Sequence, residues 1–244
     1  MAPSSHDRHT ARFQVLRWQS AIHNLPPPLI DSAALTLQVA LAATVIVGIA
    51  GTVLGRWLAR GKGVWRDLVD LVVMLPLLLP PTVLGWYLTR VFGRTRPVGA
   101  VLEGVGLGVM FSWRGAVLAS AVVALPMMTR AARTAFESID HTLEEAAALD
   151  GATGLRRWRL LLLPLAARGL AGGAALAFAR AAGEFGATLM LGGNIPGSTQ
   201  TLSLALYDAF NRGDDAAAGT IALLLVAISA AVMLVTLRSV AGKW

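Results

Sequence analysis

Two charged residues, Arg180 and Glu184, lie within an otherwise apolar stretch of the sequence. Residues four apart share one face of a helix, so the guanidinium and the carboxylate can form an ion pair. A charge inside a membrane is costly and by default marks a functional site, whereas a pair that neutralises itself can serve only to hold helices together. The residue types support both interpretations. The next residues, Phe185 and Gly186, indicate a helix that breaks up into a loop.

A second interruption lies at Pro80 and Pro81, inside an apolar stretch from Leu71 to Thr89. Proline is tolerated in membrane helices where neighbouring groups satisfy the carbonyls that it frees. A kinked packing helix is the simpler interpretation, and a broken helix that lines a pathway is the other. We group the residues at the two interruptions as a candidate pathway or gate: Pro80, Pro81, Arg180, Glu184, Phe185 and Gly186.

A charged elbow is predicted around the segment Glu144–Gly151. Thr142 and Glu145 have the spacing of a capping box, in which each side chain binds a backbone N–H of the first helical turn. Gly151 can adopt the left-handed conformation that ends a helix. Thr153 can cap a second helix that follows. The pattern predicts two short helices joined by a sharp turn.

Hydrogen-bonding groups also occur in the polar run Ser198–Thr201, which could bind an oxyanion, although a solvated turn is the simpler interpretation. Motifs for catalysis are missing. The sequence has no G-x-x-x-x-G-K-[ST] phosphate loop, and neither H-E-x-x-H nor G-x-S-x-G occurs. There is no cysteine, and the four histidines fall outside the apolar stretches. We predict no catalytic residue, no metal and no cofactor, so a partner must supply the energy for any powered transport.

The composition predicts an all-α integral membrane protein. Of the 244 residues, 55% are hydrophobic and only 14% are charged, and the mean hydropathy is +0.63. A soluble domain of this size would rarely carry so few charges. The net charge of +7 fits basic loops beside anionic lipid better than nucleic-acid binding. The expected partners therefore include membrane lipid and exclude nucleic acid.

About five transmembrane helices are predicted, each close to the roughly 20 residues that cross the hydrocarbon. Residues 1–30 form an extramembrane tail, and residues 31–244 form the membrane domain with a loop at about 137–163. Lys and Arg are more frequent on the side of this loop, which places the loop and the C-terminus in the cytoplasm and the N-terminus outside. The predicted spans are 32–55, 71–89, about 104–129, about 163–192 and 216–237.

The elbow has the residues of a known motif. Glu145-Ala146-Ala147, Gly151 and Leu161-x-Leu163-Pro164 resemble the EAA–G–I–LP motif of binding-protein-dependent ABC importer permeases, with leucine at position 161 in place of the usual isoleucine. Further stretches narrow the resemblance to the molybdate permeases of that superfamily: 75–81, 111–118, 177–188 and 194–202. Departures from the family pattern are Asp150, where an apolar residue is common, and Leu155, where tryptophan is frequent.

This resemblance implies the type I ABC importer permease fold in the plasma (cell inner) membrane. It implies a homodimer of this chain with two cytoplasmic ATP-binding subunits and an external substrate-binding protein. The cargo would be molybdate, with tungstate indistinguishable by sequence, and the alternative within the class is sulfate or thiosulfate. An ion-coupled secondary transporter is a more distant alternative, for which Glu184 is the one candidate carboxylate. The residues expected to couple to the ATPase are Glu144, Glu145, Ala146, Ala147, Gly151, Leu163 and Pro164.

Overall fold

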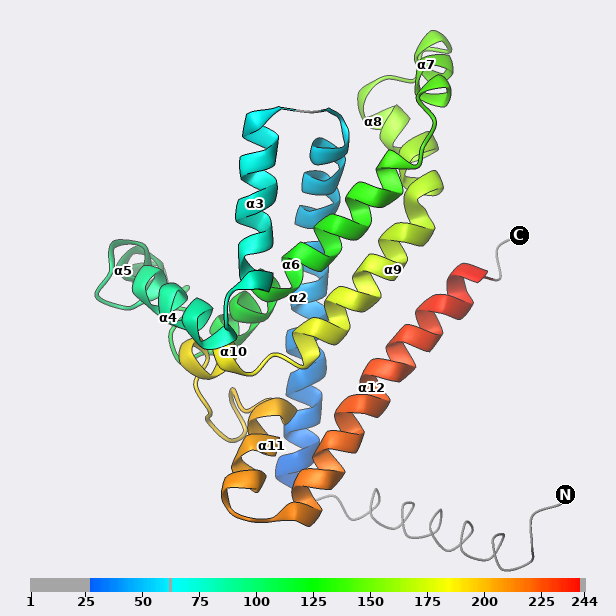
Figure 1. Cartoon of the computed structure of the whole chain (residues 1–244). Helices are drawn as coiled ribbons and strands as arrows, with labels where there is room; N and C mark the ends of the chain where they lie inside the picture. Colours follow the sequence, from blue (N-terminus) through cyan, green and yellow to red (C-terminus); the bar gives the residue numbers. More distant parts are fainter. Residues whose placement is uncertain (1–26, 62, 242–244) are drawn as a thin grey trace, which may run out of the picture.

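The computed structural model describes residues 27–61 and 63–241, so most of the predicted tail at 1–30 lies outside the described residues. Every regular element in this part of the chain is a helix (Figure 1). The elements in order are α2 (Pro27–Ala59), α3 (Val64–Leu78), α4 (Pro81–Phe92), α5 (Pro97–Gly104), α6 (Trp113–Glu137), α7 (His141–Leu149), α8 (Gly154–Arg157), the π-helical turn η1 (Trp158–Leu162), α9 (Leu163–Ala182), α10 (Gly186–Leu191), α11 (Leu202–Asn211) and α12 (Asp215–Ala241).

The prediction of an all-helical protein with about five spans is confirmed. Among the described residues, four helical stretches are long and apolar enough to cross a membrane, namely Leu29–Ala59, Trp113–Glu137, Gly154–Ala182 and Asp215–Thr236. A fifth span results if the bent pair α3 and α4 is counted as one. The first and last predicted spans correspond to α2 and α12.

The second predicted span is not one kinked helix. Helix α3 ends at Leu78, α4 begins at Pro81, and the two axes differ by 116°. Leu79, which precedes a proline, is extended (φ −83°, ψ 143°), as expected because the following proline ring disfavours the helical conformation. The structure therefore has the broken helix that the sequence left as the second interpretation.

Two other predicted boundaries are wrong. The third span starts at Trp113 rather than near 104, because the Ser112 side chain accepts a hydrogen bond from the Gly115 N–H and caps α6 there. The predicted span at 163–192 is two helices, since α9 ends at Ala182 and α10 begins at Gly186. Two of the predicted spans are therefore broken in the described part of the chain, one between α3 and α4 and one between α9 and α10. We call these the two helix breaks.

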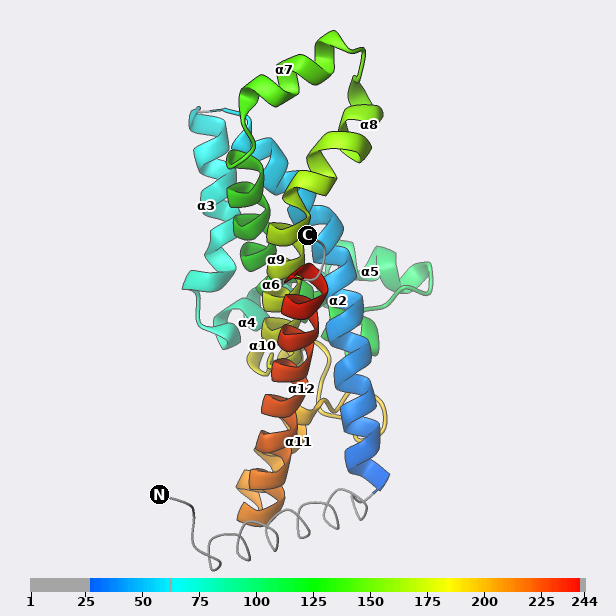
Figure 2. The same cartoon turned by 90° about the vertical axis from the view of Figure 1, so that its right-hand side faces the viewer.

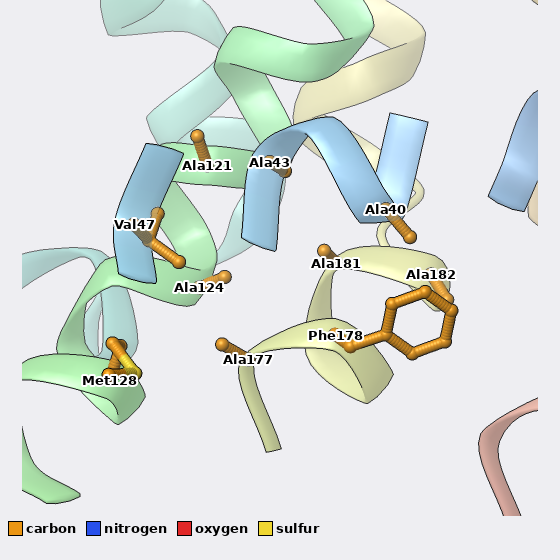
Figure 3. Close-up of a cluster of buried hydrophobic side chains, with 10 residues drawn as sticks. All are labelled: Ala40, Ala43, Val47, Ala121, Ala124, Met128, Ala177, Phe178, Ala181 and Ala182. Carbon is orange, nitrogen blue, oxygen red and sulfur yellow. The ribbon is translucent and has the colours of Figure 1, made fainter. Parts of the chain in front are cut away.

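Helix α6 lies at the centre of the bundle, where it packs against both α2 and α9, and these two helices also contact each other (Figure 1). Small side chains allow this close approach. A Cβ added at Gly55 of α2 would lie 2.6 Å from the Cβ of Ala132, and one at Gly173 of α9 would lie 2.6 Å from the Cβ of Ala131. Figure 3 shows the adjoining buried cluster, which is formed mainly by alanines of α2, α6 and α9 together with Val47, Met128 and Phe178.

The helix pair α7–α8 projects from one end of the bundle, beside the connection between α2 and α3 (Figures 1 and 2). Helix α11 lies at the opposite end, packed against the first part of α12. We call the segment from Asp140 to Leu162 the elbow. Its position at the end of the bundle leaves most of its surface uncovered within this chain.

Candidate functional site

Helix α7, the first helix of the elbow, has a different N-cap residue from the one that the sequence pattern predicted. The Asp140 carboxylate accepts a hydrogen bond of 2.9 Å from the Thr142 N–H, so the predicted capping box of Thr142 and Glu145 is wrong. Aspartate is a preferred N-cap residue, and here it starts the helix at His141. This hydrogen bond also lowers the pKa of Asp140, because it favours the ionised form of the carboxyl group.

Gly151 ends α7 in the predicted left-handed conformation, with φ +77°. The Ala152 N–H binds the carbonyl of Ala147 at 2.8 Å, and the Gly151 N–H binds that of Ala148 at 3.1 Å. These two bonds form a Schellman motif, which satisfies carbonyls that the helix end would leave unpaired. Thr153 lies at the N-cap of α8 as predicted, but its side chain makes no capping hydrogen bond.

The two glutamates of the elbow have different environments. Glu145 is exposed, whereas Glu144 is buried. Both carboxylate oxygens of Glu144 accept hydrogen bonds from Nη2 of Arg56, at 2.6 and 2.5 Å. Arg56 lies in the last turn of α2, and its guanidinium also stacks over the ring of Phe136 at 5.6 Å. Sequence reasoning counted Arg56 only as a basic residue between spans and missed this ion pair.

The exposed surface of the elbow combines apolar side chains with charged ones, namely Asp140, Glu145, Asp150, Arg156 and Arg159. Leu149 is 90% exposed, and Leu143 and Leu155 are also exposed. Ala146 and Ala148 lie open beside Glu145, while Ala147 is half-buried. Such side chains gain free energy when another surface removes them from water. The elbow thus has the properties of a contact surface for another subunit.

The elbow joins α9 through the π-helical turn η1. The Leu163 N–H binds the carbonyl of Trp158, five residues earlier, where an α-helix would use four. Pro164 follows in the same continuous helical stretch, where it cannot donate a backbone hydrogen bond. Leu163 and Pro164 are both exposed.

At the other candidate site, both carboxylate oxygens of Glu184 accept hydrogen bonds. One oxygen accepts a hydrogen bond of 2.8 Å from Nη1 of Arg180, and the other accepts one of 2.8 Å from the Ala187 N–H. The predicted Arg180–Glu184 ion pair is confirmed. Because Ala187 lies in the first turn of α10, Glu184 also provides the acceptor that this helix end needs.

The two helix breaks pack against each other, which brings Pro81 and Gly186 together. A Cβ added at Gly186 would lie 2.9 Å from the Cβ of Pro81 and 3.1 Å from the backbone nitrogen of Thr82. Only glycine allows this approach of α10 to α4. The Phe185 ring stands 5.0 Å from that of Tyr207, and both rings line a cavity of about 460 Å³ beside α11 and α12. Pro80 is exposed at the N-cap of α4.

A family model for the "binding-protein-dependent transport system inner membrane component" matches residues 51–241. The chain belongs to this family. The match covers both the elbow and the contact between the helix breaks. This inner membrane component is therefore a multi-pass protein of the inner membrane, and its family acts together with a binding protein.

Several curated proteins are similar to this inner membrane component over most of its length. It is 43% identical over 199 residues to the putative molybdenum transport system permease protein YvgM of Bacillus subtilis, over 80% of this chain and 86% of that protein. It is 41% identical over 173 residues to the molybdenum transport system permease protein ModB of Escherichia coli K12, over 70% and 76% of the two chains. The sulfate transport system permease protein CysT of Salmonella typhimurium is 32% identical over 203 residues, which cover 83% and 73% of the chains.

Solved structures show the same fold. A chain of the MetNI methionine ABC transporter in inward-facing conformations matches with a TM-score of 0.62 and 22% identity, over 88% of this chain and 98% of that one. A chain of a bacterial ABC transporter that imports the acidic polysaccharide alginate matches with a TM-score of 0.69 and 14% identity, over 91% and 81%. The inner membrane component thus has the ABC importer permease fold.

The polar run after α10 is largely buried and is not a solvated turn. In this inner membrane component Thr199, Gln200 and Thr201 are buried. The Gln200 amide donates to Asp208 at 2.7 Å, and the Asn194 amide donates to the other oxygen of the same carboxylate at 2.9 Å. The solvated turn is therefore wrong for Thr199–Thr201. Gln200 fastens the loop to α11, while the buried Thr201 hydroxyl has no hydrogen-bond partner among the described residues.

Proposed function

We propose that this chain is the permease of a molybdate importer, and that it acts as a homodimer with two cytoplasmic ATP-binding subunits and an external binding protein. The observation that carries the proposal is the likeness to molybdenum permeases at 43% and 41% identity, against 32% for the sulfate permease. Tungstate is a second expected cargo, because it is a tetrahedral oxyanion like molybdate.

In this proposal the elbow docks on the ATP-binding subunit. Its exposed leucines and Glu145 are available for contact, and it stands clear of the bundle on the side where basic residues are more frequent (Figure 2). Basic residues favour the cytoplasmic side, where the ATP-binding subunit would be. ATP binding would then change the distance between the two elbows of the dimer, as a rigid-body movement between two arrangements.

We also propose that the contact between the two helix breaks forms the gate. Pro81 and Gly186 lie where α4 and α10 meet, and Glu184 fixes the start of α10. The Arg180 side chain is a quarter exposed, so part of it remains accessible beside this contact. A rigid, closely packed contact of this kind opens as a unit rather than by gradual deformation.

The ion-coupled alternative receives less support. A coupling ion needs a carboxylate that can bind and release it, but both oxygens of Glu184 already accept hydrogen bonds within the chain. Releasing the Arg180 guanidinium would leave a buried charge uncompensated. We therefore retain sulfate transport as the second candidate function, because CysT matches over most of the chain.

The function is tested with the permease, its ATP-binding subunit and its binding protein in liposomes. We expect molybdate and tungstate to stimulate ATP hydrolysis and anion uptake, and sulfate to do so weakly. The permease alone serves as the control and should hydrolyse no ATP. Strong stimulation by sulfate with none by molybdate would replace the first candidate by the second.

The orientation gives a separate prediction, tested with single cysteines in a chain that has none. Thr153 and Ser198 are both exposed. Thr153 lies between α7 and α8 at one end of the bundle, and Ser198 lies in the loop that leads to α11 at the other end (Figure 1). An impermeant thiol reagent added to intact cells should label Ser198→Cys and spare Thr153→Cys until the membrane is opened. The reverse pattern would show that the elbow faces outward and would exclude its contact with a cytoplasmic ATPase.

A further inference from the structure

The buried ion pair between Arg56 and Glu144 joins the elbow to the end of α2. We propose that this pair is a rigid link, through which a displacement of α7 is passed to α2. Glu144 and Arg56 are then positioning residues, while Glu145 is left to contact the partner. This inference rests on the proposed function and adds to it. It names the contact within the chain that would pass a movement of the elbow to the membrane helices.

The first argument is the geometry of the pair. Its residues are 88 positions apart in sequence, and the side chains of Arg56 and Glu144 are only 6% and 11% exposed. If either group moved away, it would leave the other charge buried without a partner, which is strongly unfavourable. The two groups are therefore expected to move together.

The second argument is that α7 has little else to hold it to the bundle. All nine residues of α7 are described, and only Glu144 among them is buried. Leu143 and Leu149 point away from the protein and are exposed. Apart from the chain connections at its two ends, the orientation of α7 thus depends on the Glu144 carboxylate.

The third argument is the position of Arg56 within α2. Its guanidinium is stacked on Phe136 of α6, and the Phe136 ring meets the edge of Trp158 in η1 at 5.6 Å. Gly55, the preceding residue, is where α2 approaches the α6 backbone most closely in this region, with a Cβ position 2.7 Å from the Arg133 nitrogen. The ion pair therefore joins α2 at a position where α2 cannot move without also moving α6.

The experiment measures both movement and coupling in the complete transporter in liposomes. Spin labels on Thr142→Cys in α7 and Val53→Cys in α2, both exposed sites, report the distance between the two helices with and without a non-hydrolysable ATP analogue. In dimers in which only one of the two protomers carries the labels, and which are otherwise unaltered, we expect one narrow distance that is the same in both states. In Glu144→Gln the distribution should broaden and differ between the states.

The same Glu144→Gln complex should continue to hydrolyse ATP, but its anion uptake per ATP should fall at least about fivefold, the low end of typical coupling between sites. The exchanged pair Arg56→Glu with Glu144→Arg should restore part of both properties. The matched control is Glu137→Gln, which removes a carboxylate from an exposed pair at the end of α6 and should change neither. If Glu144→Gln does not assemble, Glu144→Asp retains the charge on a shorter side chain and should give a smaller change in the same direction.

An unchanged narrow distance and normal uptake per ATP in Glu144→Gln, or in Glu144→Asp where that variant has to be used, would overturn the link. Failure of the proposed function looks different, since the unaltered complex would then show no ATP-driven uptake of any oxyanion. The distance measurement would still report on the link in that case.

Discussion

The Arg180→Ala variant is expected to lose about 3–5 kcal/mol of unfolding free energy, the usual cost of removing one partner from a buried ion pair. The Glu184 side chain is 1% exposed, and without Arg180 its carboxylate would retain the Ala187 N–H but no positive charge. The loss is measured as a decrease in unfolding midpoint in detergent, followed by the fluorescence of the tryptophans.

The control for this variant is Arg94→Ala, which breaks a 3.6 Å pair with Glu103 whose side chains are 62% and 46% exposed. Exposed pairs contribute only about 0–1 kcal/mol. Adding Glu184→Gln to Arg180→Ala should recover part of the loss, because it removes the uncompensated charge. Equal stability of Arg180→Ala and Arg94→Ala would show that Glu184 does not depend on the guanidinium.

The Gly55→Val variant should separate α2 from α6 and cost at least about 1–3 kcal/mol, as expected for overpacking. A Cβ at this position meets backbone atoms, namely the Arg133 nitrogen at 2.7 Å and the Thr129 oxygen at 2.8 Å. Backbone cannot rotate away as a side chain can, so a whole helix must shift. We expect a lower unfolding midpoint and poor assembly with the ATP-binding subunit.

Gly48→Val is the matched control, since it lies in the same helix and a Cβ there has no neighbour within 4 Å. Both substitutions introduce the same β-branched side chain into α2 and carry the same cost in helix propensity. Any difference between them therefore measures the contact with α6. A Gly48→Val variant as damaged as Gly55→Val would contradict the packing argument.

Local rules predicted those features that depend on residues close together in sequence. The spacing of four indicated the Arg180–Glu184 pair, although Glu184 lies beyond the end of α9 and not on the face of that helix. The left-handed Gly151 follows from the freedom of glycine at a helix end. The long apolar runs likewise predicted α2 and α12. The family resemblance was also available from the sequence, because the elbow motif keeps its residues and their spacing.

Features that depend on distant contacts could not be predicted. Glu144 and Glu145 are adjacent, and no local rule says which one faces Arg56, because the answer depends on how α7 is rotated relative to α2. Proline at positions 80 and 81 indicated an interruption but not its angle of 116°. The hydrogen bond from Gln200 to Asp208 could not be predicted either. Asp208 lies in the next helix, and the burial of Gln200 comes from the fold of the loop.

The π-helical turn at Trp158–Leu162 determines the direction in which α7 and α8 project from α9. It holds one residue more than an α-helical turn would, and each residue of an α-helix corresponds to about 100° of rotation. Deleting one residue from η1 would rotate α7 and α8 around the α9 axis by about that angle, and Glu144 would no longer face Arg56. It would also shift Trp158 and Leu162 out of their packing against Phe136 of α6. The number of residues between Gly151 and Pro164 therefore determines how α7 and α8 are rotated about the α9 axis, as well as how far they lie from α9.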